Sequence, residues 1–179
     1  MDAAFLKYSS LAESTKKKIV FSTAYLFVLV TSLILSGIIL IFKTPFVFLM
    51  QVPDKYNYLI LYVVLILLFD TLALVPFANL RLHRKAGKFV FIKMSFIILN
   101  IALILVFIIK FKYGIQAIFL SNLLASLITL LMLLPEIFKN LQFTIDKEEL
   151  KKMLKFGLPY LPASISATIV QVIDRPILT

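Results

Sequence analysis

The sequence predicts an all-α fold, a polytopic membrane helix bundle with about five transmembrane helices. Hydrophobic residues make up 61% of the 179 residues and charged residues only 16%, whereas soluble domains are about 45–50% apolar and about 25% charged. The mean hydropathy is +1.02 over the whole chain. The apolar residues also form long runs with few or no charges. A soluble enzyme, a secreted disulfide scaffold and a disordered tail are therefore excluded.

Four of these runs are long enough to cross about 30 Å of hydrocarbon, which takes roughly 20 residues of helix. They are predicted to span about residues 19–42, 58–80, 91–110 and 114–135. The first run is uncharged, the second contains only Asp70, and the fourth ends at Pro135. Near the ends of the third stand Lys93 and Lys110, whose amines can snorkel to the interface. A fifth, broken or partial span is expected over residues 156–173.

These runs are predicted to be helices although many of their residues favour strands in water. In lipid, every backbone N–H and C=O must be satisfied within its own segment or in a closed barrel. Barrel strands are about ten residues long and alternate polar with apolar side chains. The runs here are longer and do not alternate, which favours helices.

The basic residues indicate how the helices are oriented. The net charge is +10, and the chain has 19 Lys and Arg residues. Fourteen of them fall in the N-terminal tail and in the second and fourth loops, and four in the first and third loops. Because Lys and Arg gather in cytoplasmic loops, the first group is expected in the cytoplasm. The charge is divided among short loops, which argues against a nucleic-acid-binding surface.

The connection over residues 141–156 is the most polar stretch of the chain and is predicted to hold a short amphipathic helix on the cytoplasmic surface. Asp146 stands three residues before Glu149, the spacing of a capping box. Its simplest role is to connect two groups of helices, and a lipid sensor is the alternative. Residues 157–179 would begin a further helix. Neither end of the chain resembles a natural terminus, so the chain is expected to be part of a longer protein.

Asp70 is the first candidate functional residue. A carboxylate in the middle of a span costs about 2.5–3.5 kcal/mol on insertion scales and is functional by default. Arg81 follows three helical turns later on almost the same face, with Pro76 between them. We expect Asp70 to face a cavity and to pair with a cation or take up a proton. The alternative is a structural carboxylate that is hydrogen-bonded to a neighbouring helix.

A second candidate site lies near the end of the chain. Gln171 and Arg175 continue a polar stripe on one helix face, and Asp174 stands beside it. This stripe could line a cavity in which Arg175 meets an anionic head group. Alternatively, Asp174 and Arg175 mark a helix end and are simply solvated.

The other candidates are weaker. Asn100 and Asn122 lie in polar stripes of the third and fourth spans, and such stripes are often contacts between helices. A polar stripe on every helix nevertheless suggests a shared hydrated cavity. Arg81 and Arg84 could bind a phosphate at the cytoplasmic mouth, because guanidinium binds phosphate bidentately. Alternatively, their charge reflects topology alone.

The sequence lacks most of the residues and motifs that an enzyme or a metal site would need. It has no cysteine and a single histidine, His83, and it lacks a Gly-rich phosphate loop, an HExxH motif and a nucleophile elbow. We expect no catalytic activity and no cofactor.

Two motifs resemble a known family. Residues 75–82 (VPFANLRL) resemble the end of the fourth helix of bacterial O-antigen and lipopolysaccharide flippases. Residues 157–167 (GLPYLPASISA), followed by Asp174 and Arg175, resemble the seventh helix, and residues 1–5 the tail of the second. These flippases form a branch of the multidrug/oligosaccharidyl-lipid/polysaccharide exporter superfamily.

The resemblance implies a transporter of twelve to fourteen helices with two lobes around a central cavity. Residues 1–140 would belong to the first lobe, residues 157–179 would begin the second, and the connector 141–156 would join them. The implied function is to flip undecaprenyl-pyrophosphate-linked oligosaccharide across the bacterial inner membrane by alternating access, coupled to a proton or sodium ion. Membrane lipids are further expected partners. A cation or drug exporter of the same superfamily is the alternative, and a membrane transferase is a third.

Overall fold

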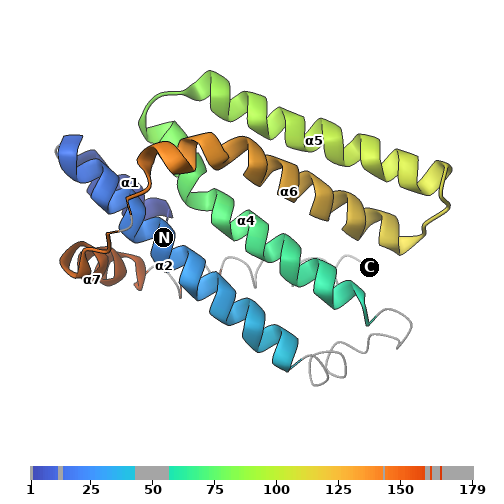
Figure 1. Ribbon diagram of the computed structural model, residues 1–179, viewed down its shortest axis with the longest axis horizontal. Coiled ribbons are helices and arrows are strands. Elements are labelled where there is room, and N and C mark those ends of the chain that lie inside the picture. The colour runs from blue at the N-terminus through green and yellow to red at the C-terminus, as the bar shows by residue number, and fades with distance from the viewer. Residues whose placement is uncertain are drawn as a thin grey trace.

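The computed structural model describes residues 2–11, 14–42, 57–142, 144–159, 162 and 166, and these form an all-helical bundle without strands (Figure 1). The helices are α1 (Asp2–Leu11), α2 (Ser14–Ile41), α4 (Leu59–Leu82), α5 (Ala86–Ile109), α6 (Ile115–Asn140) and α7 (Lys147–Gly157). Within the described part, α2, α4, α5 and α6 are long and apolar enough to cross a membrane. The predicted class, a membrane helix bundle, is thus confirmed. Most of the predicted fifth span, 156–173, lies outside the described residues.

Three helix ends differ by five residues from the sequence prediction. Helix α2 begins at Ser14 rather than at residue 19. Helix α5 begins at Ala86 rather than near residue 91. Lys88 and Lys93 do not mark its membrane boundary, because their amines contact Glu136 and the Phe77 ring inside the protein. Helix α6 continues through Pro135 to Asn140, so the predicted end at Pro135 was wrong. A proline removes one hydrogen bond, and neighbouring helices can compensate for this loss in a membrane helix.

The four long helices run alternately up and down and are not packed in chain order. Helix α4 packs against α2, and α6 packs against both α4 and α5. Helices α4 and α5 contact each other mainly near the turn that joins them, where Phe77 packs edge-on against Phe89 at 5.5 Å. The order across the bundle is therefore α2, α4, α6, α5 (Figure 1). This arrangement leaves a gap between α4 and α5 that α6 closes from one side.

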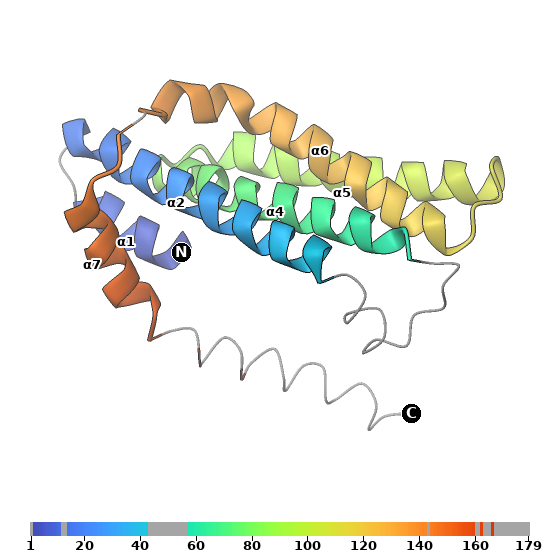
Figure 2. The ribbon, with the colours of Figure 1, turned by 60° about the horizontal axis from the view of Figure 1, so that its bottom comes forward.

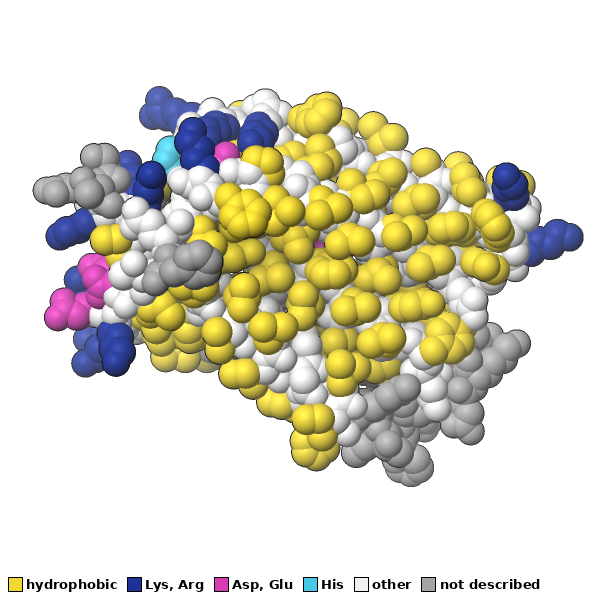
Figure 3. Space-filling model, in the orientation of Figure 1, with side chains coloured by type: hydrophobic (Ala, Val, Ile, Leu, Met, Phe, Trp, Pro, Cys, Tyr) yellow, Lys and Arg dark blue, Asp and Glu magenta, His cyan; other side chains and the backbone are white. Residues whose placement is uncertain are grey.

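The main core lies at one end of the bundle, where the short helices α1 and α7 cover α2 (Figure 2). The ring of Phe5 packs edge-on against Phe21, which stacks on Tyr25. From the other elements, Leu133 and Met153 are fully buried there. We call this the basic end, because it also holds the start of α2, the α4–α5 turn, the end of α6 and α7 with most of the described lysines and arginines (Figure 3).

At the opposite end, aromatic rings and two lysines surround the short α5–α6 turn. Phe107 and Phe111 lie 5.9 Å apart, and Phe111 and Tyr113 lie 5.7 Å apart, between ring centres. Lys110 and Lys112 are both exposed beside them. Aromatic rings with an apolar body and a polar edge are enriched at membrane interfaces. In α5 itself only Ile92 is buried, so most of this apolar helix is available to lipid or to other helices.

Hydroxyl groups on α2 fix the connection between α6 and α7. Ser22 donates a hydrogen bond to the carbonyl of Asn140 at 3.3 Å and accepts one from the backbone N–H of Gln142 at 2.6 Å. One residue on, the hydroxyl of Thr23 accepts from the N–H of Asp146 at 3.1 Å. Ser22 is buried, so this part of the polar stripe on α2 serves packing between helices.

The predicted helix start at Asp146 is confirmed, but the predicted capping box is only half formed. Its carboxylate accepts hydrogen bonds from the N–H groups of Glu148 and Glu149, as an N-cap should. The reciprocal bond of a capping box is absent between these described residues. The N–H of Asp146 goes to Thr23, and the Glu149 carboxylate instead accepts from Lys152 at 2.8 Å.

Candidate functional site

The gap between α4 and α5 contains a cavity of about 210 Å³, which we call the α4–α5 cleft. Its walls are largely apolar, but an acid and an amine open into it. It is lined by Asp70, Ala73, Leu74 and Phe77 of α4, Lys93 and Phe96 of α5, and Thr129 of α6. Because α6 closes one side, the cleft is a shared hollow among three helices.

Asp70 stands near the midpoint of α4 and is exposed toward this cleft. Ser126 of α6 donates a hydrogen bond to Asp70 Oδ1 at 2.7 Å. Thr129 lies one turn further along α6, but its hydroxyl donates to the carbonyl of Ala125 in its own helix. Asp70 Oδ2 has no hydrogen-bond partner among the described residues, so one carboxylate oxygen is oriented by the protein and the other can bind a proton or cation.

Lys93 supplies the positive charge of the cleft. Its Nζ lies 4.6 Å from the centre of the Phe77 ring, a distance at which the ring face attracts a cation. Within the part of the chain that the structure describes, Asp70 and Lys93 form no ion pair. The cleft therefore presents an acid and an amine separately, and it could receive a cation or proton at one position and an anion at the other.

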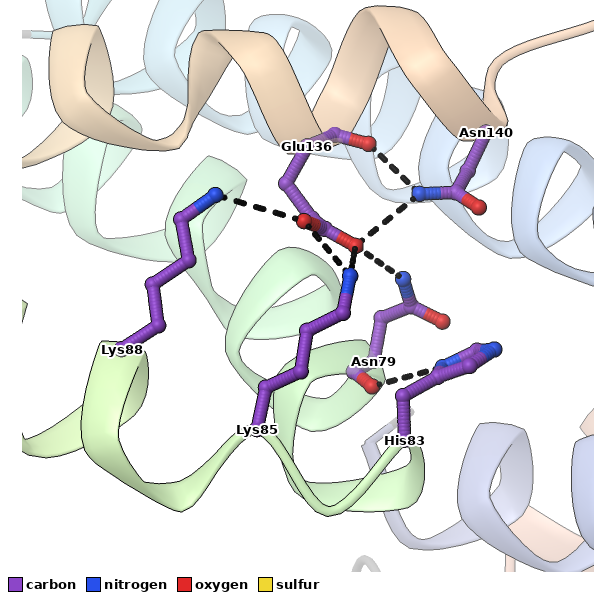
Figure 4. Close-up of polar contacts among 6 residues, drawn as sticks. All are labelled: Asn79, His83, Lys85, Lys88, Glu136 and Asn140. Atoms are coloured by element: carbon purple, nitrogen blue, oxygen red, sulfur yellow. Dashed lines mark hydrogen bonds and ion pairs between the residues drawn. The ribbon is translucent and has the colours of Figure 1, made fainter.

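A second polar cluster lies at the basic end, around Glu136 (Figure 4). The Glu136 side chain is only 3% exposed. Lys85 Nζ lies 3.0 and 3.2 Å from its two carboxylate oxygens, and Lys88 Nζ lies 3.4 Å from one of them. The amides of Asn79 and Asn140 donate to the same carboxylate at 3.3 and 3.2 Å. We call these five residues the Glu136 cluster.

The Glu136 cluster ties the turn between α4 and α5 to the last turns of α6. The sequence analysis attributed the charge of Lys85 and Lys88 to membrane topology. In the structure both amines instead point to the buried carboxylate of Glu136. Sequence reasoning missed this acid because it placed Glu136 after the end of the fourth span. The sequence feature that could have revealed this acid is its position directly after Pro135, at the end of an otherwise uncharged run.

The α4–α5 turn has a backbone geometry that explains how Lys85 reaches Glu136. The N–H of Lys85 donates to the carbonyl of Leu80, and the N–H of Arg84 donates to that of Arg81. This is a Schellman motif, in which the residue at the position of Arg84 adopts the left-handed conformation. Arg84 indeed has φ of 53°, a conformation that glycine adopts without strain.

Replacing Arg84 with glycine is therefore expected to stabilise the fold by about 0.5–1 kcal/mol, because it relieves this strain. Thermal unfolding in detergent would measure the gain. His83→Gly is the matched control, because His83 has an ordinary φ of −84° and should gain nothing. A lower stability of R84G than of the parent would show that the arginine side chain contributes more than its backbone strain removes.

The predicted phosphate-binding arginines lie outside the α4–α5 cleft. Both Arg81 and Arg84 are exposed at the basic end, and the Arg81 guanidinium stacks 6.0 Å from the centre of the Phe89 ring. The structure therefore does not bring Asp70 and Arg81 into one site, although they lie on the same helix.

The remaining candidates are divided between the described and undescribed parts of the chain. Asn100 Nδ2 donates to Asn122 Oδ1 at 3.4 Å, so these two amides join α5 to α6, and neither lines the cleft. Gln171, Asp174 and Arg175 lie outside the described residues. Among the residues that were searched, no group of three or more His, Cys, Asp or Glu side chains could hold a metal ion.

Comparison with known proteins gives one match. A family model described as "Polysaccharide biosynthesis protein" matches residues 10–178, almost the whole chain. No curated protein and no solved structure matches it. The match covers all four apolar helices as well as the residues of the cleft.

Proposed function

The chain belongs to the polysaccharide biosynthesis protein family, which is flippase-related, and from this premise we propose that it acts in flipping a lipid-linked oligosaccharide. The substrate would be an undecaprenyl-pyrophosphate-linked O-antigen or lipopolysaccharide repeat unit. It would cross the inner membrane of a bacterium by alternating access, with the basic end of the bundle in the cytoplasm. Family membership supports a role in polysaccharide biosynthesis, and the helices support a membrane location.

The observation that carries the proposal is the α4–α5 cleft. A carrier needs polar groups that face an internal hollow rather than lipid. Asp70 and Lys93 line such a hollow at the level of the apolar helices, and buried Ser126 holds Asp70 in place by a hydrogen bond. In our proposal, Asp70 takes up the coupling proton or sodium ion. Lys93 and the cations Arg81, Arg84 and Arg175 attract the pyrophosphate. Gln171, Asp174, Asn100 and Asn122 would contribute polar surface to the passage for the sugar.

The alternative, an exporter of cationic drugs, would use Asp70 as the binding site for the drug. The position of Lys93 argues against it. Its amine already lies over the Phe77 ring in the same cleft, so an aromatic face that could hold an organic cation is occupied by a cation of the protein.

Deleting the gene that encodes this chain tests the proposal. We expect loss of surface polysaccharide and accumulation of lipid-linked oligosaccharide in the cytoplasmic leaflet, both restored by the full-length gene. Normal polysaccharide with greater sensitivity to cationic drugs would instead identify the exporter. Loss of polysaccharide without any lipid-linked precursor would identify a transferase, and either result would overturn the flippase proposal.

A further inference from the structure

Helix α7 presents an uncovered face on which positive charge and apolar side chains run side by side. An open groove of about 420 Å³ lies along this face. It is lined by Lys147, Lys151, Lys155 and by Leu150, Leu154, Leu158. Within each set the residues are four apart, so each forms a row along the helix. All of the lining residues come from α7 and the residue that follows it.

The opposite face of α7 is already occupied by the protein. Met153 is fully buried. Lys7 of α1 places its Nζ 3.9 Å from the centre of the Phe156 ring, and Tyr8 of α1 packs edge-on against the same ring at 6.2 Å. Helix α7 is therefore held against α1 in a fixed rotation, which determines the side on which the two rows point outward.

The lysines of α7 differ in whether they have an acidic partner. Lys152 lies outside the lysine row and donates a hydrogen bond to Glu149 at 2.8 Å, and this bond raises the pKa of the Lys152 amine. In contrast, Lys147, Lys151 and Lys155 are exposed and form no ion pair with any residue that the structure describes. Among the described residues this row of amines therefore has no ion-pair partner, and Leu158 beside it is 55% exposed.

We propose that this face of α7 docks on the anionic leaflet of the bilayer that the long helices cross. The three leucines would enter the boundary between headgroups and acyl chains, and the three lysines would bind anionic headgroups. A leaflet with negative headgroups above acyl chains matches both rows, whereas a free phosphate would match only the lysines. Most of the other described basic residues of the bundle gather at the same end as α7 (Figure 3), which places α7 near the membrane surface. The proposal is independent of the transported substrate.

These 179 residues contain no cysteine. Once any cysteine elsewhere in the full-length protein is replaced with serine, a single engineered cysteine reports on the position of α7. We would label an L158C variant of the full-length protein with an environment-sensitive fluorophore and reconstitute it in nanodiscs. One set of discs contains phosphatidylcholine alone, and the other adds about 30% phosphatidylglycerol, near the anionic content that gives a strong surface potential. Lipids with a nitroxide on the acyl chain quench the label only where it enters the bilayer.

We expect quenching to be stronger in the anionic discs and to weaken in high salt, because salt screens headgroup charge. Each lysine near an anionic surface contributes about 1 kcal/mol, or roughly fivefold in the docking equilibrium. Adding K147Q, K151Q and K155Q together should therefore shift this equilibrium by more than about tenfold. Adding K152Q, which removes an exposed amine on another side of α7, should leave quenching nearly unchanged.

Three results would overturn the proposal. These are equal quenching in the two lipid mixtures, full quenching in the triple variant, and no quenching in either mixture, as when another part of the protein covers the groove. A melting curve for each variant shows that it remains folded. Because the three lysines are exposed and unpaired within the described chain, their replacement should leave the melting temperature nearly unchanged.

Discussion

Replacing Asp70 with asparagine is expected to abolish surface polysaccharide while the protein stays folded and inserted. Asparagine has the same shape and keeps an oxygen that can accept the hydrogen bond from Ser126, which lies 2.7 Å from Asp70 Oδ1. It cannot take up a proton or carry negative charge. Since a carboxylate at mid-membrane costs about 2.5–3.5 kcal/mol on insertion scales, D70N should insert at least as well as the parent. A loss of surface polysaccharide in D70N would therefore result from the loss of the ionisable carboxylate and not from misfolding.

The measurement is surface polysaccharide in cells that lack the native gene and express D70N, with the amount of protein determined by immunoblot. Thr129→Val is the matched control. Thr129 also lines the cleft, but its hydroxyl bonds to the carbonyl of Ala125 and not to Asp70. We expect nearly normal polysaccharide from T129V. Normal polysaccharide from D70N would show that Asp70 is a structural residue, and would remove it from the proposed mechanism.

The features that could be predicted from sequence are those that the membrane alone imposes. A long uncharged run must become a helix in lipid because its backbone groups have no other partners, and α4 follows its predicted range closely. Asp70 could be selected for a similar reason. A lone carboxylate in such a run must avoid the acyl chains, and the structure shows which helices provide its surroundings.

The features that could not be predicted depend on which helices pack against one another. The start of α5 and the end of α6 were misplaced because Lys88 and Glu136 were assigned separately to loops, whereas in the structure each lies within a helix and they pair with each other. Sequence periodicity gives the face of one helix, but not the neighbour against which that face packs. For the same reason the sequence grouped Asp70 with Arg81, and the structure groups it with Ser126 and Lys93.

Removing the Glu136 carboxylate is the second change with a large expected effect, and here the effect is on stability. Glu136→Ala leaves four donor side chains of the Glu136 cluster without their shared acceptor. Breaking a fully buried ion pair costs about 3–5 kcal/mol. Because the Lys85 and Lys88 side chains are 38% and 43% exposed, they can turn toward water or headgroups, so we expect a smaller loss of about 2–3 kcal/mol. For a chain of this size that lowers the melting temperature by about 5–10 °C.

Thermal unfolding of E136A in detergent measures this effect, and Lys139→Gln is its control. Lys139 is an exposed charge in the last turn of the same helix, so its loss should change stability by less than about 0.5 kcal/mol. Glu136→Gln should lie between E136A and the parent, because its amide oxygen can still accept from Asn79 and Asn140. If E136A melts like the parent, the cluster does not hold the α4–α5 turn on α6. The two polar sites should therefore respond differently to substitution. E136Q should lower stability, and it should reduce transport only in proportion to the loss of folded protein. D70N should abolish transport without changing stability.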